Sequence, residues 1–408
     1  MILASVVAAA PWVIAPYLQL GADDQTGASR SLTLRWFAKD TSGYGVRYDP
    51  DGRGMREAPV EAKNRALSAR LNGLTRDFRY EVTRNGQTLL SATAKAPPPR
   101  TSGYSAIVMG DSGRGLRGQY RLAQTLGKET PSLLVHTGDI VYPKGKEDEY
   151  TRFHFPVYNA EPGSPTGIPF LRRVTSVATP GNHDTGYRST KNGLAYYLAW
   201  DQPTSMPGQQ SELSTLAARR KEKARGNFSF AWGDSWWTVL DANPYRNWKS
   251  KENRAWLDRE LTRGKAYGWR FVVWHQPGFH SSRNKEDERY MTSVYDLMTK
   301  HRVAVVFNGH VHNYQRTHPI RVEGGKTILD QSYKGDGHAN GTITVVTGAG
   351  GAELYDQLMA AKPTTWKPFT AKYVAGYSFT RLEVGAGAIR ISQIGIGGKV
   401  LDTFRIAR

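Results

Sequence analysis

Five short segments, each at the end of an apolar run, combine oxygen or imidazole donors with glycine or with the last residue of the run. They are Gly110-Asp111-Ser112-Gly113, Gly138-Asp139-Ile140-Val141-Tyr142, Gly181-Asn182-His183-Asp184, Val272-Val273-Trp274-His275 and Gly309-His310-Val311-His312. The runs at 106–109, 133–136, 174–178, 271–274 and 303–307 are continuously apolar, as is typical of strands buried on both faces. Because ligands of α/β sheets bind beyond the carboxyl ends of strands, the segments predict one shared site.

The sequence predicts two domains, which the length of 408 residues also favours. Segments with helix-like sequence, at 116–126 and 293–301, alternate with the apolar runs. This alternation indicates an α/β domain over 104–408. Residues 11–97 instead alternate apolar and polar positions, at 32–36 and 78–82, with turn pairs such as Asn85-Gly86. We expect a small all-β sandwich there, and a stiff linker at 98–103.

Residues 1–10 are small and apolar and end in an Ala-Xaa-Ala-like pattern, but they lack the basic start of an export signal. A clipped export signal and a first strand are equally compatible with them. No stretch of the sequence predicts a membrane span. A charge run at 219–223 is most simply a solvated part of an insertion.

The formal net charge of +19 suggests anionic partners, but it is spread evenly. Residues 11–97 hold 13 Lys+Arg against 9 Asp+Glu, and the remainder holds 42 against 27, so both parts are about equally basic per residue. A uniformly basic surface does not predict a nucleic-acid groove, and no nucleic-acid partner is expected.

The chain has no cysteine, which excludes disulfides, thiolate nucleophiles and Cys-ligated metals. Asp, Asn, His and Tyr form a donor set suited to iron, zinc or manganese. A carboxylate can bridge two cations, and two cations about 3.5–4 Å apart can hold both the attacking and the leaving oxygen of a phosphoryl displacement. Seven candidate ligands are about what two such ions require.

The five segments in this order resemble the calcineurin-like metallophosphoesterases. Tyr142, three residues after Asp139, is similar to the purple acid phosphatase branch in particular. The sandwich, with Pro16-Tyr17-Leu18-Gln19 near its start, resembles the fibronectin III-like domain of plant-type and bacterial members, and the stretch 341–348 also matches. The resemblance implies a sandwich of two mixed β-sheets flanked by helices, preceded by the small β domain.

Carried over position by position, the resemblance implies two metal ions. Ferric iron would be bound by Asp111, Asp139, Tyr142 and His312, and a second Fe(II), Zn or Mn ion by Asp139, Asn182, His275 and His310. The ferric ion would turn the tyrosine into a coloured phenolate ligand.

The activity implied is hydrolysis of phosphate monoesters by a metal-bound hydroxide, with a small phosphate ester as substrate. His183 is the first candidate for protonating the leaving oxygen and His280 is the second. Arg114 and Tyr314 are candidates for contacting substrate, and Asp184 either orients a neighbour or caps a helix.

Other functions are also compatible with the sequence. The same centre could act on phosphodiesters or nucleotides, since the pocket that decides between them is not visible in the sequence. An inactive binding or adhesion protein is the alternative of another class. We expect the protein to be exported, either secreted or periplasmic. The sequence does not predict its oligomeric state.

Overall fold

The computed structural model describes residues 11–21, 30–185, 194–203, 206, 226–285 and 288–408. The segment 1–10, for which an export signal or a first strand is expected, and the charge run at 219–223 lie outside these residues. In the described part, no helix is long and apolar enough to cross a bilayer.

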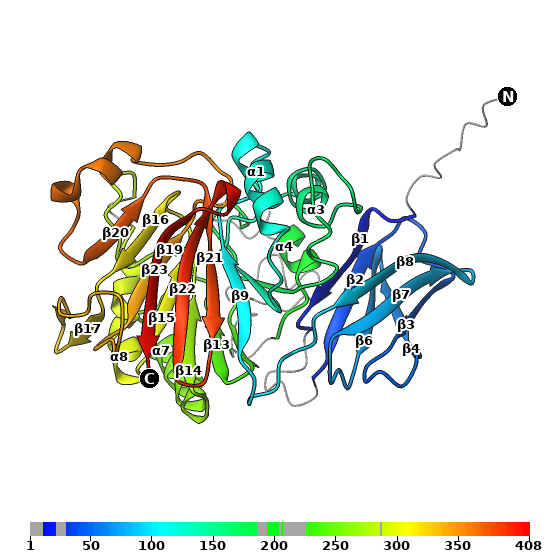
Figure 1. Ribbon diagram of the computed structural model, residues 1–408, viewed down its shortest axis with the longest axis horizontal. Helices are drawn as coiled ribbons and strands as arrows, with labels where there is room; N and C mark the ends of the chain where they lie inside the picture. The colour runs from blue at the N-terminus through cyan, green and yellow to red at the C-terminus, as the bar shows by residue number, and fades with distance from the viewer. Residues whose placement is uncertain (1–10, 22–29, 186–193, 204–205, 207–225, 286–287) are drawn as a thin grey trace.

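A four-stranded antiparallel sheet forms one layer of the N-terminal part (Figure 1). Its order is β4 (Arg56–Ala58), β3 (Tyr44–Tyr48), β7 (Phe78–Arg84) and β8 (Gln87–Ala94). Asn85 and Gly86 join β7 to β8 with φ of 49° and 81°, the left-handed pair that a two-residue hairpin requires. Phe78, Tyr80 and Val82 are buried, so the predicted alternation of β7 is confirmed.

The second layer of the N-terminal part belongs to a ten-stranded sheet that runs on into the rest of the molecule. It contributes β1 (Ile14–Gln19), β2 (Leu32–Phe37), β5 (Val60–Lys63) and β6 (Ala66–Leu71). β1 pairs in parallel with β11 (Thr175–Ala178), where Gln19 lies opposite Ser176. The predicted boundary near residue 97 stays a prediction, and the sheet itself crosses between the two parts.

Both faces of β2 are covered, whereas the alternating sequence predicts one buried face. Leu34 and Trp36 pack in the core of the sandwich. On the other face Phe37 packs in a second cluster with residues of α4 (Leu194–Ala199). The Arg35 guanidinium also donates to the Leu198 carbonyl, at 3.0 Å from Nε. The second face is buried because a segment distant in sequence packs against it.

The ten-stranded sheet is completed by strands from both ends of the predicted α/β domain: β9 (Tyr104–Met109), β10 (Leu133–His136), β21 (Ser378–Val384), β22 (Ala388–Gly395) and β23 (Val400–Ala407). A seven-stranded sheet has the order β12 (Phe228–Trp232), β13 (Ser235–Val239), β14 (Trp269–Val273), β15 (Val305–Asn308), β19 (Ile343–Thr347), β16 (Tyr314–Thr317) and β20 (Thr370–Val374). β17 (Ile320–Glu323) and β18 (Lys326–Leu329) form a separate hairpin.

Both large sheets are mixed, as the resemblance implies. β9, β10 and β11 are parallel, whereas β21 is antiparallel to β9. β13, β14, β15 and β19 are parallel, whereas β12 and β16 are antiparallel to their neighbours. The sheets share one core, in which Val108 and Val135 pack with Trp237 and Phe271. Burial of these large side chains holds the two sheets together.

Helices cover the outer faces of the sheets (Figure 1). Leu122 and Leu126 of α1 (Arg117–Leu126) pack over the ten-stranded sheet, and Leu257 and Leu261 of α7 (Lys251–Arg263) pack over the other with α8 (Tyr295–Lys300). The remaining short helices are α2 (Glu147–Glu149), η1 (Tyr150–His154), α3 (Phe155–Tyr158), η2 (Gly264–Ala266), η3 (Tyr290–Val294), η4 (Gln357–Ala361), η5 (Pro363–Thr365) and η6 (Ile396–Gly398).

Tyr17→Phe tests the junction between the N-terminal part and the rest. The fully buried Tyr17 hydroxyl donates to the Ala199 carbonyl at 2.7 Å, so its loss should lower the free energy of unfolding by about 1 kcal/mol. Urea denaturation measures this. In the control, Tyr44→Phe, water can replace the half-buried hydroxyl that donates to Pro11, and the loss should be smaller. Equal losses would contradict the junction's contribution.

Candidate metal centre

The five segments meet at the carboxyl ends of strands from both large sheets, as predicted. Asp111, Asp139 and Asn182 follow β9, β10 and β11 in the ten-stranded sheet. His275 and His310 follow β14 and β15 in the seven-stranded sheet. All five side chains are buried. The shared core therefore brings donors from two sheets to one point.

Three of the candidate ligands have a strained backbone, which sets the direction of their side chains. Asp111, Asp139 and His310 have φ of 57°, 49° and 68°, a left-handed conformation that is costly for residues other than glycine. Two neighbouring glycines are also required. A Cβ on Gly181 would overlap the Asp139 carboxylate, and one on Gly309 would lie 2.5 Å from Oδ2 of Asp111. The glycines leave room for the two carboxylates.

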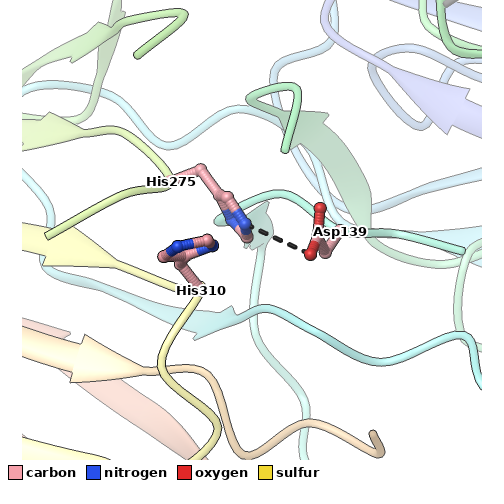
Figure 2. Close-up of side chains that lie close together, drawn as sticks. All are labelled: Asp139, His275 and His310. Atoms are coloured by element: carbon pink, nitrogen blue, oxygen red, sulfur yellow. Dashed lines mark ion pairs between the residues drawn. The ribbon is translucent and has the colours of Figure 1, made fainter. Parts of the chain in front are cut away.

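One group of donor atoms consists of Asp139, His275 and His310, whose candidate ligand atoms lie within 4.8 Å of one another (Figure 2). Nε2 of His275 lies 3.3 Å from Oδ2 of Asp139 and 3.2 Å from Oδ1 of Asn182. The Asn182 amide nitrogen has no partner in the described part of the chain, so the amide presents its oxygen to the group.

A second group consists of Asp111, Asp139 and His312, also within 4.8 Å of one another. The Tyr142 hydroxyl completes it, at 3.1 Å from Oδ1 of Asp111 and 3.1 Å from Nε2 of His312. Asp139 belongs to both groups. A carboxylate with two oxygens between two such groups is the arrangement that lets one side chain bridge two cations.

Hydrogen bonds on the far side of each imidazole decide which nitrogen faces the groups. Nδ1 of His275 donates to the Thr137 carbonyl at 2.8 Å, and Nδ1 of His312 donates to the Glu353 carbonyl at 2.7 Å. Their Nε2 atoms therefore face the carboxylates. The imidazole of His310 has the opposite orientation, since its Nε2 forms the outer hydrogen bond, to Glu288 at 2.8 Å. Such outer partners orient the histidines of metal sites and make them more basic.

The electrostatic character of the centre favours a cation. Burial alone would raise the pKa of Asp139, but His275 and His183 outweigh burial and hold that pKa well below its usual range. Burial alone would lower the pKa of His275, and the carboxylates of Asp139 and Asp111 raise it instead. Burial and both carboxylates raise the pKa of Tyr142 far above 10, so a phenolate requires a cation. The donor set thus fits metal binding.

Two further residues tie the loops of the centre together. The buried Asp184 carboxylate accepts from the backbone N–H groups of Ile140 at 3.0 Å and Gly181 at 2.9 Å, so it orients neighbouring loops. Asn243 donates to the Pro180 carbonyl at 3.2 Å, and its Oδ1 accepts from Gln276 at 3.1 Å. Asn243 therefore joins the loop of Asn182 to the residue that follows His275.

Two sequence-predicted residues outside the proposed ligand set lie against the centre. The backbone N–H of His183 donates to Oδ1 of Asp139 at 2.8 Å, and its Nε2 lies 3.9 Å from Oδ2. The Arg114 guanidinium lies 6.0 Å from the centre of the Tyr142 ring and bonds Glu353 at 3.1 Å. The His183 ring also lies 4.5 Å from the Tyr142 ring, so both side chains are near Tyr142.

His280 and Tyr314 are both buried, but in different surroundings. His280 lies near His310, and burial, followed by Arg289 and His310, lowers its pKa to about 3. Its role as a proton donor stays a prediction. Tyr314 lies in the core with its hydroxyl donating to Asp402 at 2.8 Å. The direction of a side chain depends on packing, and packing directs Tyr314 to Asp402 and not to the metal centre.

Glu288 and Asn243 are functional candidates that the sequence analysis missed. Glu288 lies 22 residues before His310, and Asn243 lies 33 residues before Gln276. No motif connects either pair, and only the packing of the loops brings them together.

The architecture and site define a metallophosphoesterase. The family model of the calcineurin-like phosphoesterases matches residues 104–314, and the chain belongs to this family. It is similar to a nucleotide pyrophosphatase/phosphodiesterase of Hordeum vulgare, with 24% identity over 345 residues that cover 78% of this chain and 87% of that protein. It is also 23% identical over 372 residues to acid phosphatase type 7 of Mus musculus, covering 82% of this chain and 72% of that protein.

Among solved structures, the fold resembles the purple acid phosphatase PPD1 from seeds of yellow lupin, Lupinus luteus. The TM-score is 0.74 at 18% identity, covering 96% of this chain and 74% of that chain. The fold class implied by the sequence resemblance, and the likeness to purple acid phosphatases, are therefore confirmed.

Glu288→Gln tests the orientation of His310. The amide keeps the size of the side chain but removes the charge that makes His310 a stronger donor, so affinity for one of two metal equivalents should fall about 10- to 100-fold. Titration of the metal-stripped protein with zinc, followed by calorimetry, measures this. Glu57→Gln, at an exposed position of β4 in the N-terminal part, is the control and should leave both affinities unchanged. Unchanged affinity in Glu288→Gln would contradict the assigned orientation.

Proposed function

We propose that this protein is a phosphomonoesterase of the purple acid phosphatase type with two metal ions. The observation that carries the proposal is the position of Asp139, which is shared by two groups of buried donors. One carboxylate flanked on both sides by imidazole and oxygen donors suits a pair of cations better than a single one. The family to which the chain belongs supports hydrolysis of a phosphate ester.

Asp111, Asp139, Tyr142 and His312 would hold ferric iron, and Asp139, Asn182, His275 and His310 would hold Fe(II), zinc or manganese. The phenol of Tyr142 suits the more acidic cation, because only a strong positive charge offsets the two carboxylates that keep it protonated. When bound, the ions would supply Lewis acidity toward the phosphoryl group and toward water. The assignment of metals rests on donor chemistry and on the sequence resemblance.

His183 is the proposed donor of a proton to the leaving oxygen. Its Nδ1 lies 2.8 Å from the Pro143 carbonyl, which can only accept, so Nδ1 carries a proton and Nε2 is directed to the centre. An imidazolium at this position can release the Nε2 proton to an alkoxide. Arg114 is the proposed contact for a phosphate oxygen, and the ion pair with Glu353 orients it.

Residues 11–97 are proposed to form a fibronectin III-like domain, and an exported location is proposed from the apolar start of the chain. Neither proposal affects the chemistry of the centre.

Asp139→Asn tests the two-metal activity. The amide cannot bridge two cations, so hydrolysis of 4-nitrophenyl phosphate should fall by at least about 1,000-fold, the loss of about 4 kcal/mol of transition-state stabilisation. Circular dichroism checks that the fold is retained. Asp336→Asn, an exposed carboxylate paired with Arg405, should keep full activity. Full activity in Asp139→Asn would contradict the proposal.

Tyr142→Phe tests the ferric site. Iron-loaded wild-type protein should absorb in the visible region through charge transfer from tyrosinate to ferric iron, and the phenylalanine variant should lose that band. Tyr355→Phe is the control, since its ring stacks on His312 at 4.0 Å but its hydroxyl is not a proposed ligand. An iron-loaded wild-type protein without a visible band would argue for a site without tyrosinate.

His183→Gln tests the proton donor. The variant retains the backbone N–H to Asp139, so metal content should not change. Its kcat for an alkyl phosphate should fall about 100- to 10,000-fold, and its kcat for 4-nitrophenyl phosphate much less, because nitrophenolate leaves without a proton. An equal loss with both substrates would show that His183 does not protonate the leaving group.

Phosphodiester hydrolysis is the second candidate, favoured by the activity in the name of the barley relative. Relative turnover of 4-nitrophenyl phosphate and of bis(4-nitrophenyl) phosphate by the same preparation separates the two. A higher kcat/KM for the diester would replace the monoesterase proposal. A preparation that binds no metal and hydrolyses neither substrate would instead support an inactive binding protein.

A further inference from the structure

A cavity of about 670 Å³ lies at the edge of the seven-stranded sheet opposite to the metal centre. β14, β15 and β19 run parallel, and the residues lining the cavity, such as Trp269, Ala304 and Thr342, lie at or just before the starts of these strands. The candidate ligands His275 and His310 follow the other ends. Six residues of strand separate Trp269 from His275, or roughly 20 Å. The cavity is therefore distinct from the centre.

Segments distant in sequence build its walls. Thr299 comes from α8, Arg321 from the β17 hairpin, and Arg408 follows β23 of the other large sheet. A bridge between His338 and Ala407 connects the two sides. Figure 1 shows α8, β17 and the end of β23 on the same side of the molecule. An occupant would contact both sheets.

The charges around the cavity are predominantly positive. Arg270, Arg302, Arg321 and Arg408 line it together with one carboxylate, Glu323. Arg321 lies 3.6 Å from Glu323, and Arg408 lies 3.2 Å from Asp234, so these two guanidiniums are compensated.

Among the residues that the structure describes, Arg270 and Arg302 have no carboxylate partner. Arg270 donates to the carbonyls of His301 at 2.8 Å and Tyr267 at 3.1 Å. Burial, followed by the neighbouring Arg302 and Arg408, lowers the pKa of Arg270, the mark of positive charges held close together. The Arg302 side chain makes no hydrogen bond or ion pair with any residue that the structure describes. Two positive charges are thus uncompensated at this cavity.

The cavity also has an apolar floor. Tyr267, Ala304 and Ala339 line it and are only partly buried, so they present apolar surface to the cavity. Its volume lies within the range of about 300–1,000 Å³ that is typical of sites for small organic ligands. The floor suits an apolar or aromatic group, and the guanidiniums without a carboxylate partner suit an oxyanion.

We propose that this cavity binds a small organophosphate, such as a mononucleotide, at a site separate from the metal centre. A phosphate monoester carries close to two negative charges at neutral pH, which matches the two uncompensated guanidiniums, and its oxygens suit the donor fork of arginine. The apolar floor then holds the organic group. The proposal does not depend on the reaction at the metal centre.

Calorimetric titration of the full chain with adenosine 5′-monophosphate tests the proposal. The protein carries Asp139→Asn, so that turnover at the metal centre does not obscure binding, and adenosine and inorganic phosphate are titrated in parallel. We expect the mononucleotide to bind at least ten times more tightly than either part. Addition of Arg302→Gln should weaken binding at least fivefold, as should Arg270→Gln, which removes the other guanidinium without a carboxylate partner.

Arg259→Gln, an exposed arginine on α7 outside the cavity, is the matched control and should leave affinity unchanged. In the wild-type background, Arg302→Gln should hydrolyse 4-nitrophenyl phosphate at the normal rate. Absence of binding at millimolar nucleotide, or affinity unaffected by Arg302→Gln and Arg270→Gln, would overturn the site. Equally tight binding of inorganic phosphate or of adenosine would overturn the organophosphate as its ligand.

Discussion

The shared carboxylate of Asp139 is the constraint on which the candidate centre depends. It lies between imidazole donors on one side and Asp111, His312 and Tyr142 on the other. Burying two carboxylates this closely costs several kcal/mol per ion unless positive charge compensates them. The surrounding histidines supply part of that compensation, and cations would supply the rest. The left-handed backbone at Asp111, Asp139 and His310 is tolerated because the packed sheets beneath leave the loops no other path.

The fold places the donors around Asp139 by packing two sheets against each other. Strand ends from the ten-stranded sheet bring carboxylates and an amide, and those from the seven-stranded sheet bring imidazoles. In the core between the sheets, the Trp237 indole of one sheet donates to the Tyr104 hydroxyl of the other at 3.0 Å, which helps to hold the two sheets in place. The N-terminal strands extend the first sheet through β1, so the sandwich also helps to support β11 and the loop of Asn182.

Much of the candidate site could be predicted from sequence because each ligand is local to a short motif. A donor after an apolar run, with glycine beside it, can be recognised without knowing what lies opposite. Glu288, Asn243 and the carbonyl of Thr137 act only across the fold, and no sequence pattern identifies them. Tyr314 shows the same limit, because its position two residues after His312 does not determine that its side chain points to Asp402. The second buried face of β2 was hidden for the same reason, since α4 covers it from far away in sequence.

By itself, the sequence determined the strands, their ends, the donor types and the absence of thiolate chemistry, because periodicity and residue type are local properties. Only the tertiary structure decided that Asp139 is shared by two groups, which nitrogen of each histidine faces them, and that one sheet spans the N-terminal and catalytic parts. It alone revealed the arginine-lined cavity at the opposite edge of the sheet. Each of these depends on distances between segments that are far apart along the chain, and packing of the whole core sets those distances.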